Sequence, residues 1–125
     1  MAKILVIDDV ADIREGLNAV LTQEGHTITE AKDGAEGIAK LGSGQFDLVI
    51  TDIMMPEQDG TEVIMYLEDR TPRPLVLAIS GGAAKVPAYM ALHLARLKAD
   101  ATMMKPFRND ELLDKVRTLL ARGCA

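Results

Sequence analysis

The 125-residue chain has one cysteine, no tryptophan and only 3% aromatic residues. Because Cys124 has no second cysteine to pair with, an intrachain disulfide is excluded, which is typical of proteins from a reducing compartment. The apolar runs are far too short to cross a bilayer, and the first of them, at residues 4–7, leads into two aspartates rather than a signal-peptide pattern. These absences predict a cytoplasmic protein with no membrane partner.

An excess of basic residues is also missing. The net charge is −5, and the lysines and arginines are scattered singly apart from Arg70 and Arg73. Nucleic-acid binding requires clustered basic side chains that neutralise phosphates, so the sequence disfavours a nucleic-acid partner. With 48% hydrophobic and 26% charged residues, the composition is typical of a globular protein, and the length fits a single domain over residues 1–125.

Short apolar runs alternate with longer amphipathic segments along the whole chain. Strands are predicted at residues 4–7, 46–51, 75–79 and 101–104, and the more alternating segment 26–31 is typical of an edge strand. Helical spacing of apolar residues predicts helices at 10–24, 35–41, around 63–67, at 87–98 and at 110–122, with Gly25 ending the first and Asn109 capping the last. Strict alternation of this kind predicts an α/β fold: a doubly wound (βα)5 domain whose five-stranded parallel sheet carries helices on both faces.

Polar side chains stand where these predicted strands end. Asp8 and Asp9 follow the first strand, Asp52 ends the third, Ser80 the fourth and Lys105 the fifth. Ligands of parallel sheets bind at the carboxyl ends of the strands, so we expect these groups to lie at one edge. Three carboxylates brought together repel one another, which calls for a cation, and an oxygen-only ligand set favours Mg²⁺ or Mn²⁺ over zinc.

Asp52 has the chemistry of a nucleophile in such a site. A carboxylate can attack phosphorus to form an acyl phosphate, while a metal and Lys105 neutralise charge on the transferred group and Ser80 donates a hydrogen bond to it. Each residue alone has a simpler interpretation, because Asp8 or Asp9 can cap a helix, Asp52 can open a turn and Lys105 can be a surface lysine. Their coincidence at the ends of several strands favours the site.

These residues occur in a characteristic order, namely Ile7-Asp8-Asp9, then Asp52-Ile53-Met54-Met55-Pro56 with Asp59-Gly60, then Ser80, then Lys105-Pro106-Phe107. This pattern resembles the receiver domain of two-component response regulators, and the similarity covers essentially the whole chain. The resemblance implies a flavodoxin-like sheet with strand order 2-1-3-4-5. It also implies a phosphorylation switch that receives its phosphoryl group from a sensor histidine kinase or a histidine phosphotransfer protein and signals to a downstream protein through protein–protein contacts.

The resemblance further assigns a role to each site residue. Asp52 matches the phosphoacceptor, and the metal ligands are Asp8, Asp9, Asp52 and the backbone carbonyl of Met54, with Asp8 acting either directly or through a water. Ser80 matches the hydroxyl that binds the phosphoryl group, and Lys105 its ion-pair partner. The Lys105–Pro106 peptide bond corresponds to one that is usually cis in the family.

Two features depart from the family pattern. Thr102 occupies a position that commonly holds an aromatic residue whose rotamer changes on activation, so the switch uses either a smaller rearrangement at Thr102 or the loop after Ser80, and we favour the loop. The helix predicted at 87–98 is apolar over much of its circumference. It is either a well-buried helix or a face that binds a partner or a second copy in a homodimer.

Two other classes of function fit the sequence less well. A phosphohydrolase with an aspartate nucleophile usually has a second carboxylate two residues further on, where this chain has Met54. We therefore expect no enzyme beyond self-phosphorylation and slow autodephosphorylation. A scaffold that works without phosphorylation is disfavoured because the acidic site is complete.

Overall fold

The computed structural model describes residues 2–52, 66–67, 73–80, 99–105 and 107–123. The elements in chain order are β1 (Lys3–Ile7), α1 (Ala11–Gln23), β2 (Thr27–Ala31), α2 (Gly34–Ser43), β3 (Leu48–Asp52), β4 (Leu75–Ser80), β5 (Ala101–Met104) and α5 (Asn109–Gly123). Tyr66 and Leu67 are helical, as predicted for the segment around 63–67. The helix predicted at 87–98 and the loop after Ser80 lie outside the described residues.

The five strands form one parallel sheet in the order β2-β1-β3-β4-β5. This confirms the predicted fold class and strand order, including the position of residues 26–31 at an edge. In the register between β1 and β3, Ile7 lies opposite Thr51. The next residues along the two strands, Asp8 and Asp52, therefore come level with each other at the carboxyl edge of the sheet.

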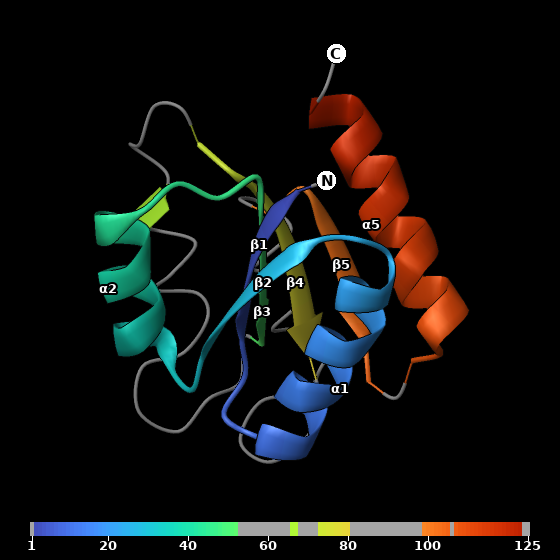
Figure 1. Cartoon of the computed structure of the whole chain (residues 1–125), viewed down its shortest axis with the longest axis horizontal. Coiled ribbons are helices and arrows are strands. Elements are labelled where there is room, and N and C mark those ends of the chain that lie inside the picture. Colours follow the sequence, from blue (N-terminus) through green and yellow to red (C-terminus); the bar gives the residue numbers. More distant parts are fainter. Residues whose placement is uncertain (1, 53–65, 68–72, 81–98, 106, 124–125) are drawn as a thin grey trace.

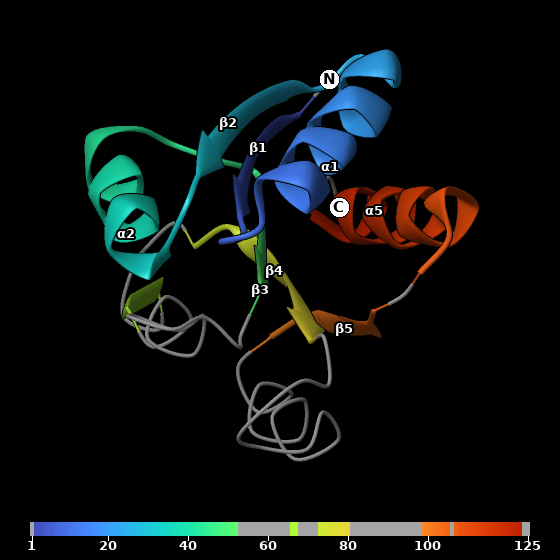
Figure 2. The same ribbon diagram turned by 90° about the horizontal axis from the view of Figure 1, so that it is seen from below.

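The sheet has a hydrophobic cluster on each face because neighbouring side chains of a strand point to opposite sides. Leu5 and Ile7 of β1 pack in the cluster that includes Leu41 of α2. Ile4 and Val6 pack in the other cluster, together with side chains of α1 and α5. Figures 1 and 2 show the same arrangement, with α2 on one side of the sheet and α1 and α5 side by side on the other. The two clusters fix the strands from both faces and thereby hold the carboxyl edge in place.

Local sequence signals account for some of the helix ends but not for all of them. Gly25 has a φ of 94° and ends α1 as predicted. An N-cap that was not predicted begins α2: the Asp33 side chain accepts from the Glu36 amide, and Glu36 accepts from the Lys32 amide just before the cap. The prediction that Asn109 caps the last helix is wrong, because α5 includes Asn109 and the first helical hydrogen bond runs from the Leu112 amide to the Arg108 carbonyl.

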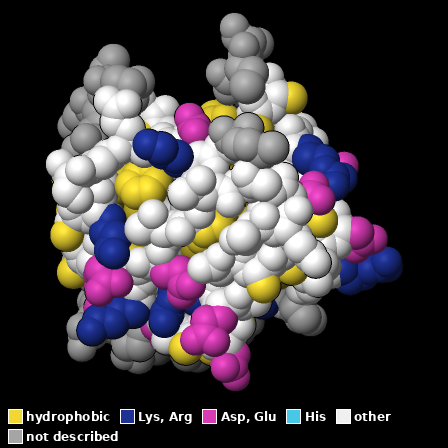
Figure 3. Space-filling view, viewed as in Figure 1, with side chains coloured by type: hydrophobic (Ala, Val, Ile, Leu, Met, Phe, Trp, Pro, Cys, Tyr) yellow, Lys and Arg dark blue, Asp and Glu magenta, His cyan; other side chains and the backbone are white. Residues whose placement is uncertain are grey.

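The described part of the chain contains no helix that is both long and apolar enough to span a bilayer. On the face of the molecule shown in Figure 3, the described Lys and Arg side chains lie among Asp and Glu side chains rather than in a patch of their own. The described side chains of that face therefore form no clustered basic patch.

Candidate functional site

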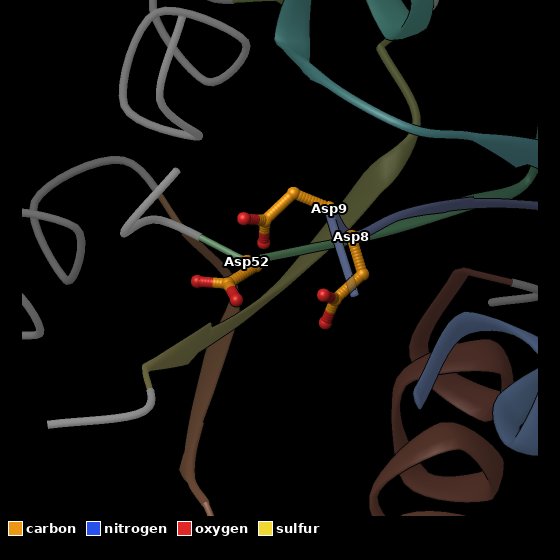
Figure 4. A group of neighbouring side chains, drawn as sticks. All are labelled: Asp8, Asp9 and Asp52. Atoms are coloured by element: carbon orange, nitrogen blue, oxygen red, sulfur yellow. The ribbon is translucent and has the colours of Figure 1, made fainter. Parts of the chain in front are cut away.

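Three aspartates meet at the carboxyl edge of the sheet. Asp8 and Asp9 follow β1 and Asp52 is the last residue of β3, and one carboxylate oxygen of each lies within 4.8 Å of the others. Asp8 is 1% and Asp52 4% exposed, whereas Asp9 is exposed. Figure 4 shows the three side chains leaving the ends of the two strands at the same edge. The prediction that these carboxylates converge is confirmed.

Two hydrogen bonds hold Asp8 in place, one through its backbone amide and one through its side chain. Its amide donates to the Ala31 carbonyl at 3.1 Å, and its Oδ1 accepts from the Val10 amide at 2.9 Å. The N-cap position of α1 belongs to Val10, and no side chain caps it. The alternative in which Asp8 or Asp9 is the helix cap is therefore wrong, and Asp8 instead orders the turn before the helix.

Lys105 joins the two buried carboxylates. Its Nζ donates to Asp8 Oδ2 at 2.9 Å and to Asp52 Oδ2 at 2.7 Å. Burial by itself lowers the pKa of the Lys105 ammonium, but the hydrogen bonds and charges of Asp52 and Asp8 outweigh this effect and raise the pKa above its usual value. The side chain is therefore a fixed positive charge between two negative ones.

The donor set fits a hard divalent cation. Three carboxylates face one ammonium, which leaves an excess of two negative charges at this edge. Carboxylate oxygens are the ligands that Mg²⁺ takes in proteins, usually together with several waters. The exposed position of Asp9 leaves one side of the cluster open to solvent, from which water ligands and a phosphoryl group can approach.

The remaining predicted site residues are placed only in part. Ser80 is the last residue of β4 and lies in register with Met104 of β5. Thr102 is partly buried in β5, opposite Ala78. Met54, with the predicted carbonyl ligand, and the Lys105–Pro106 peptide bond fall outside the described residues. The roles of these groups stay predictions.

Arg14 also contacts the site, although the sequence did not predict it. Its Nη1 donates to the Asp8 carbonyl at 2.8 Å, and its Nε donates to Glu30 Oε1 at 2.9 Å. An arginine in the first turn of a helix carries no signal of such a role by itself. The only available hint was its position six residues after Asp8, close to the end of β1 once the helix begins at Ala11.

A family model described as the response regulator receiver domain matches residues 4–117. Among curated proteins, the chain is 36% identical over 123 residues to the transcriptional regulatory protein ResD of Bacillus subtilis, and 34% identical over 121 residues to the transcriptional regulatory protein TcrA of Mycobacterium tuberculosis. Each alignment covers 97% of this chain but only 49% and 47% of the respective relative. The chain thus spans about half the length of these curated relatives.

Solved structures show the same likeness. The response regulator TrrA of Thermotoga maritima, in complex with Mg²⁺-BeF, has a TM-score of 0.82 and 35% identity, with 95% of this chain and 99% of that chain covered. A CheY-like receiver domain protein of Methanospirillum hungatei has a TM-score of 0.87 and 27% identity, with 98% and 96% covered.

Proposed function

Because this chain belongs to the response regulator receiver domain family, we propose that Asp52 is the phosphoacceptor of a phosphorylation-dependent signalling switch. The observation that carries the proposal is the convergence of Asp8, Asp9 and Asp52 with the Lys105 ammonium at one sheet edge. A buried nucleophile, an adjacent fixed cation and an oxygen-ligand cluster are together what phosphoryl transfer to a carboxylate requires.

The chain's own residues divide the chemistry between them. A carboxylate oxygen of Asp52 attacks the phosphorus atom of the phosphorylated donor histidine, and a P–O bond forms. The bond from phosphorus to the histidine nitrogen breaks, and its electron pair remains on that nitrogen. Lys105 already donates to Asp52 and is placed to neutralise negative charge on an incoming phosphoryl oxygen. The β3 backbone keeps Asp52 level with Asp8 throughout.

We infer that Asp8, Asp9 and Asp52 bind Mg²⁺, with Mn²⁺ as a substitute. When bound, the ion neutralises charge on the phosphoryl oxygens. The geometry of the three carboxylates and their excess of negative charge support this assignment. The TrrA structure, which holds Mg²⁺-BeF, supports it by similarity.

We propose a histidine kinase or a histidine phosphotransfer protein as the phosphoryl donor, and output through protein–protein contacts in the cytoplasm. The relatives are transcriptional regulatory proteins about twice as long as this chain. The contacts are therefore made either with a separate protein or with a further domain of the same polypeptide. We propose no turnover of outside substrates, since Met54 stands two residues after Asp52.

The proposal is tested by incubating the chain with acetyl phosphate and Mg²⁺ and measuring its intact mass. We expect one phosphate adduct in the wild type, its loss in Asp52→Asn, and its retention in Asp12→Asn, which removes an exposed acidic group of α1. A wild type without an adduct, or an Asp52→Asn variant that keeps it, would contradict the assignment. Steady phosphate release from a small phosphomonoester over many turnovers would instead support an enzyme.

A further inference from the structure

A ring of three hydrogen bonds closes around the turn that carries Asp9. The Val10 amide donates to Asp8 Oδ1 at 2.9 Å, and the Arg14 amide donates to the Val10 carbonyl at 3.0 Å. Arg14 Nη1 completes the ring by donating to the Asp8 carbonyl at 2.8 Å. The ring joins the end of β1 to the first turn of α1, so the backbone of Asp9 is fixed although its side chain is exposed.

Arg14 is itself held from the neighbouring strand. Its Nε donates to Glu30 Oε1 at 2.9 Å, and Asn18 Nδ2 donates to Glu30 Oε2 at 2.6 Å. Glu30 belongs to β2, where it pairs with Val6 of β1. A guanidinium has five donors in one rigid plane and can therefore serve the Glu30 carboxylate and the Asp8 carbonyl at once. The 17% exposure of the Arg14 side chain agrees with a fixed position.

We infer that Arg14, held by Glu30, is a positioning residue for the acidic site. It fixes residues 8–10 so that the carboxylates of Asp8 and Asp9 face Asp52 against their mutual repulsion. The described side-chain contacts of Arg14 are with the Asp8 carbonyl and the Glu30 carboxylate, so Arg14 acts on the site through the backbone of the turn. The inference rests on the proposed function, because it assumes that the three carboxylates take a divalent cation.

The positioning effect can be separated from a plain charge effect, because the two have opposite signs. A positive charge near the cluster weakens cation binding, so its removal alone would tighten the binding of Mg²⁺. Loss of a group that orients metal ligands weakens binding, typically by 10–100-fold. The direction of the change in Mg²⁺ affinity therefore decides between them.

The test is a titration of the full ¹⁵N-labelled chain with MgCl₂. The amide chemical shifts are recorded at each step and give the Mg²⁺ dissociation constant. We expect Arg14→Met to raise the Mg²⁺ dissociation constant about 10-fold or more. Arg14→Lys keeps the charge but has a single donor group, so it should fall between Arg14→Met and the wild type. Arg117→Met is the matched control, because it removes the same charge and an ion pair to Glu24 beyond the other end of α1. Its dissociation constant should equal that of the wild type.

An Arg14→Met dissociation constant equal to or below that of the wild type overturns the inference. If Arg14→Met does not fold, Arg14→Lys decides, and a wild-type value for it overturns the inference as well. If the wild type forms the Asp52 adduct and binds Mg²⁺, and the Arg14 variants bind Mg²⁺ equally well, only the inference about Arg14 is overturned. The proposed function then stands. A wild type that binds no Mg²⁺ overturns both.

Discussion

At the scale of single residues, Lys105 links the two strand ends of the acidic site. Its ammonium bonds two carboxylates that are almost fully buried, so its removal leaves like charges facing each other without a cation. Uncompensated buried charge is expensive, commonly several kcal/mol. Because its pKa is raised above 10.5, the stability that Lys105 contributes is fully present below pH 10.5 and is lost as the pH rises through the folded-state pKa.

We expect Lys105→Met to lower the free energy of unfolding by about 3 kcal/mol in Mg²⁺-free buffer. Added Mg²⁺ should restore part of this loss, since a cation that binds only the folded state stabilises it. Urea unfolding with and without MgCl₂ measures both effects. Lys32→Met, at an exposed lysine, is the control and should change little. An equal loss in the two variants would contradict the role of Lys105.

Gly37 of α2 shows how closely this helix approaches the sheet. A Cβ atom built at Gly37 would overlap the Ile7 Cδ1 atom, and Ile7 is 1% exposed and enclosed in the core. We expect Gly37→Ala to destabilise the fold by about 1–3 kcal/mol through overpacking. Gly16→Ala is the matched control in α1, where a Cβ meets nothing within 4 Å, and it should stabilise by up to about 1 kcal/mol. Urea unfolding of both variants tests this, and equal effects would contradict the packing described.

At the scale of elements, Glu30 connects the edge strand β2 to α1. The hydrogen bond from Asn18, aided by Arg14, outweighs the effect of burial and lowers the pKa of Glu30 below 4.5. A lowered folded-state pKa means that the ionised carboxylate stabilises the fold above the unfolded-state pKa, and that this contribution is lost as the pH falls through the folded-state pKa. The effect is confined to no more than about 1 kcal/mol because solvent screens the partly exposed pair.

The difference in unfolding free energy between the wild type and Glu30→Gln should therefore be largest at neutral pH and shrink below pH 4.5. Denaturant unfolding at a series of pH values measures it. Glu15→Gln, at an exposed position of α1, serves as the control. A difference that grows as the pH falls would contradict the lowered pKa of Glu30.

The elements also show which features the sequence determines. All five strands were predicted to within two residues because buried apolar runs and parallel pairing leave few alternatives. The helix ends were harder to predict. The Asp33 N-cap was missed and Asn109 was wrongly assigned as a cap, because the position of a cap depends on where the backbone turns into the helix. The Arg14–Glu30 pair was not predictable, because it depends on the rotamers of two side chains brought together only by the packing of α1 against β2.

The acidic site was easier to predict than its supports. Asp8, Asp9, Asp52 and Lys105 follow directly from the rule that parallel strands end at one edge. The sequence did not show that Lys105 bonds Asp8 as well as Asp52, because that contact depends on the direction of a long side chain.

At the scale of the whole molecule, the excess negative charge of the site should make stability depend on divalent cations. We expect Mg²⁺ at 100 times its dissociation constant to add about 2.7 kcal/mol to the free energy of unfolding. Thermal unfolding in MgCl₂ and in EDTA measures the shift. Asp9→Asn should lose most of it, while Asp12→Asn, three residues further along, should keep it. If Asp9→Asn were stabilised by Mg²⁺ as much as the wild type, Asp9 would not be a ligand of the cation.

The strand order has a further consequence for the kinetics of opening. β1, which leads into Asp8 and Asp9, and β3, which ends in Asp52, each pair with a strand on both sides, whereas β2 and β5 lie at the sheet edges. Backbone amides of central strands exchange with deuterium mainly on global unfolding, and those of edges through smaller fluctuations. Deuterium uptake should therefore be slower in β1 and β3 than in β2 and β5. Asp8 and Asp52 then stay in register through the partial openings that release the edges of the sheet.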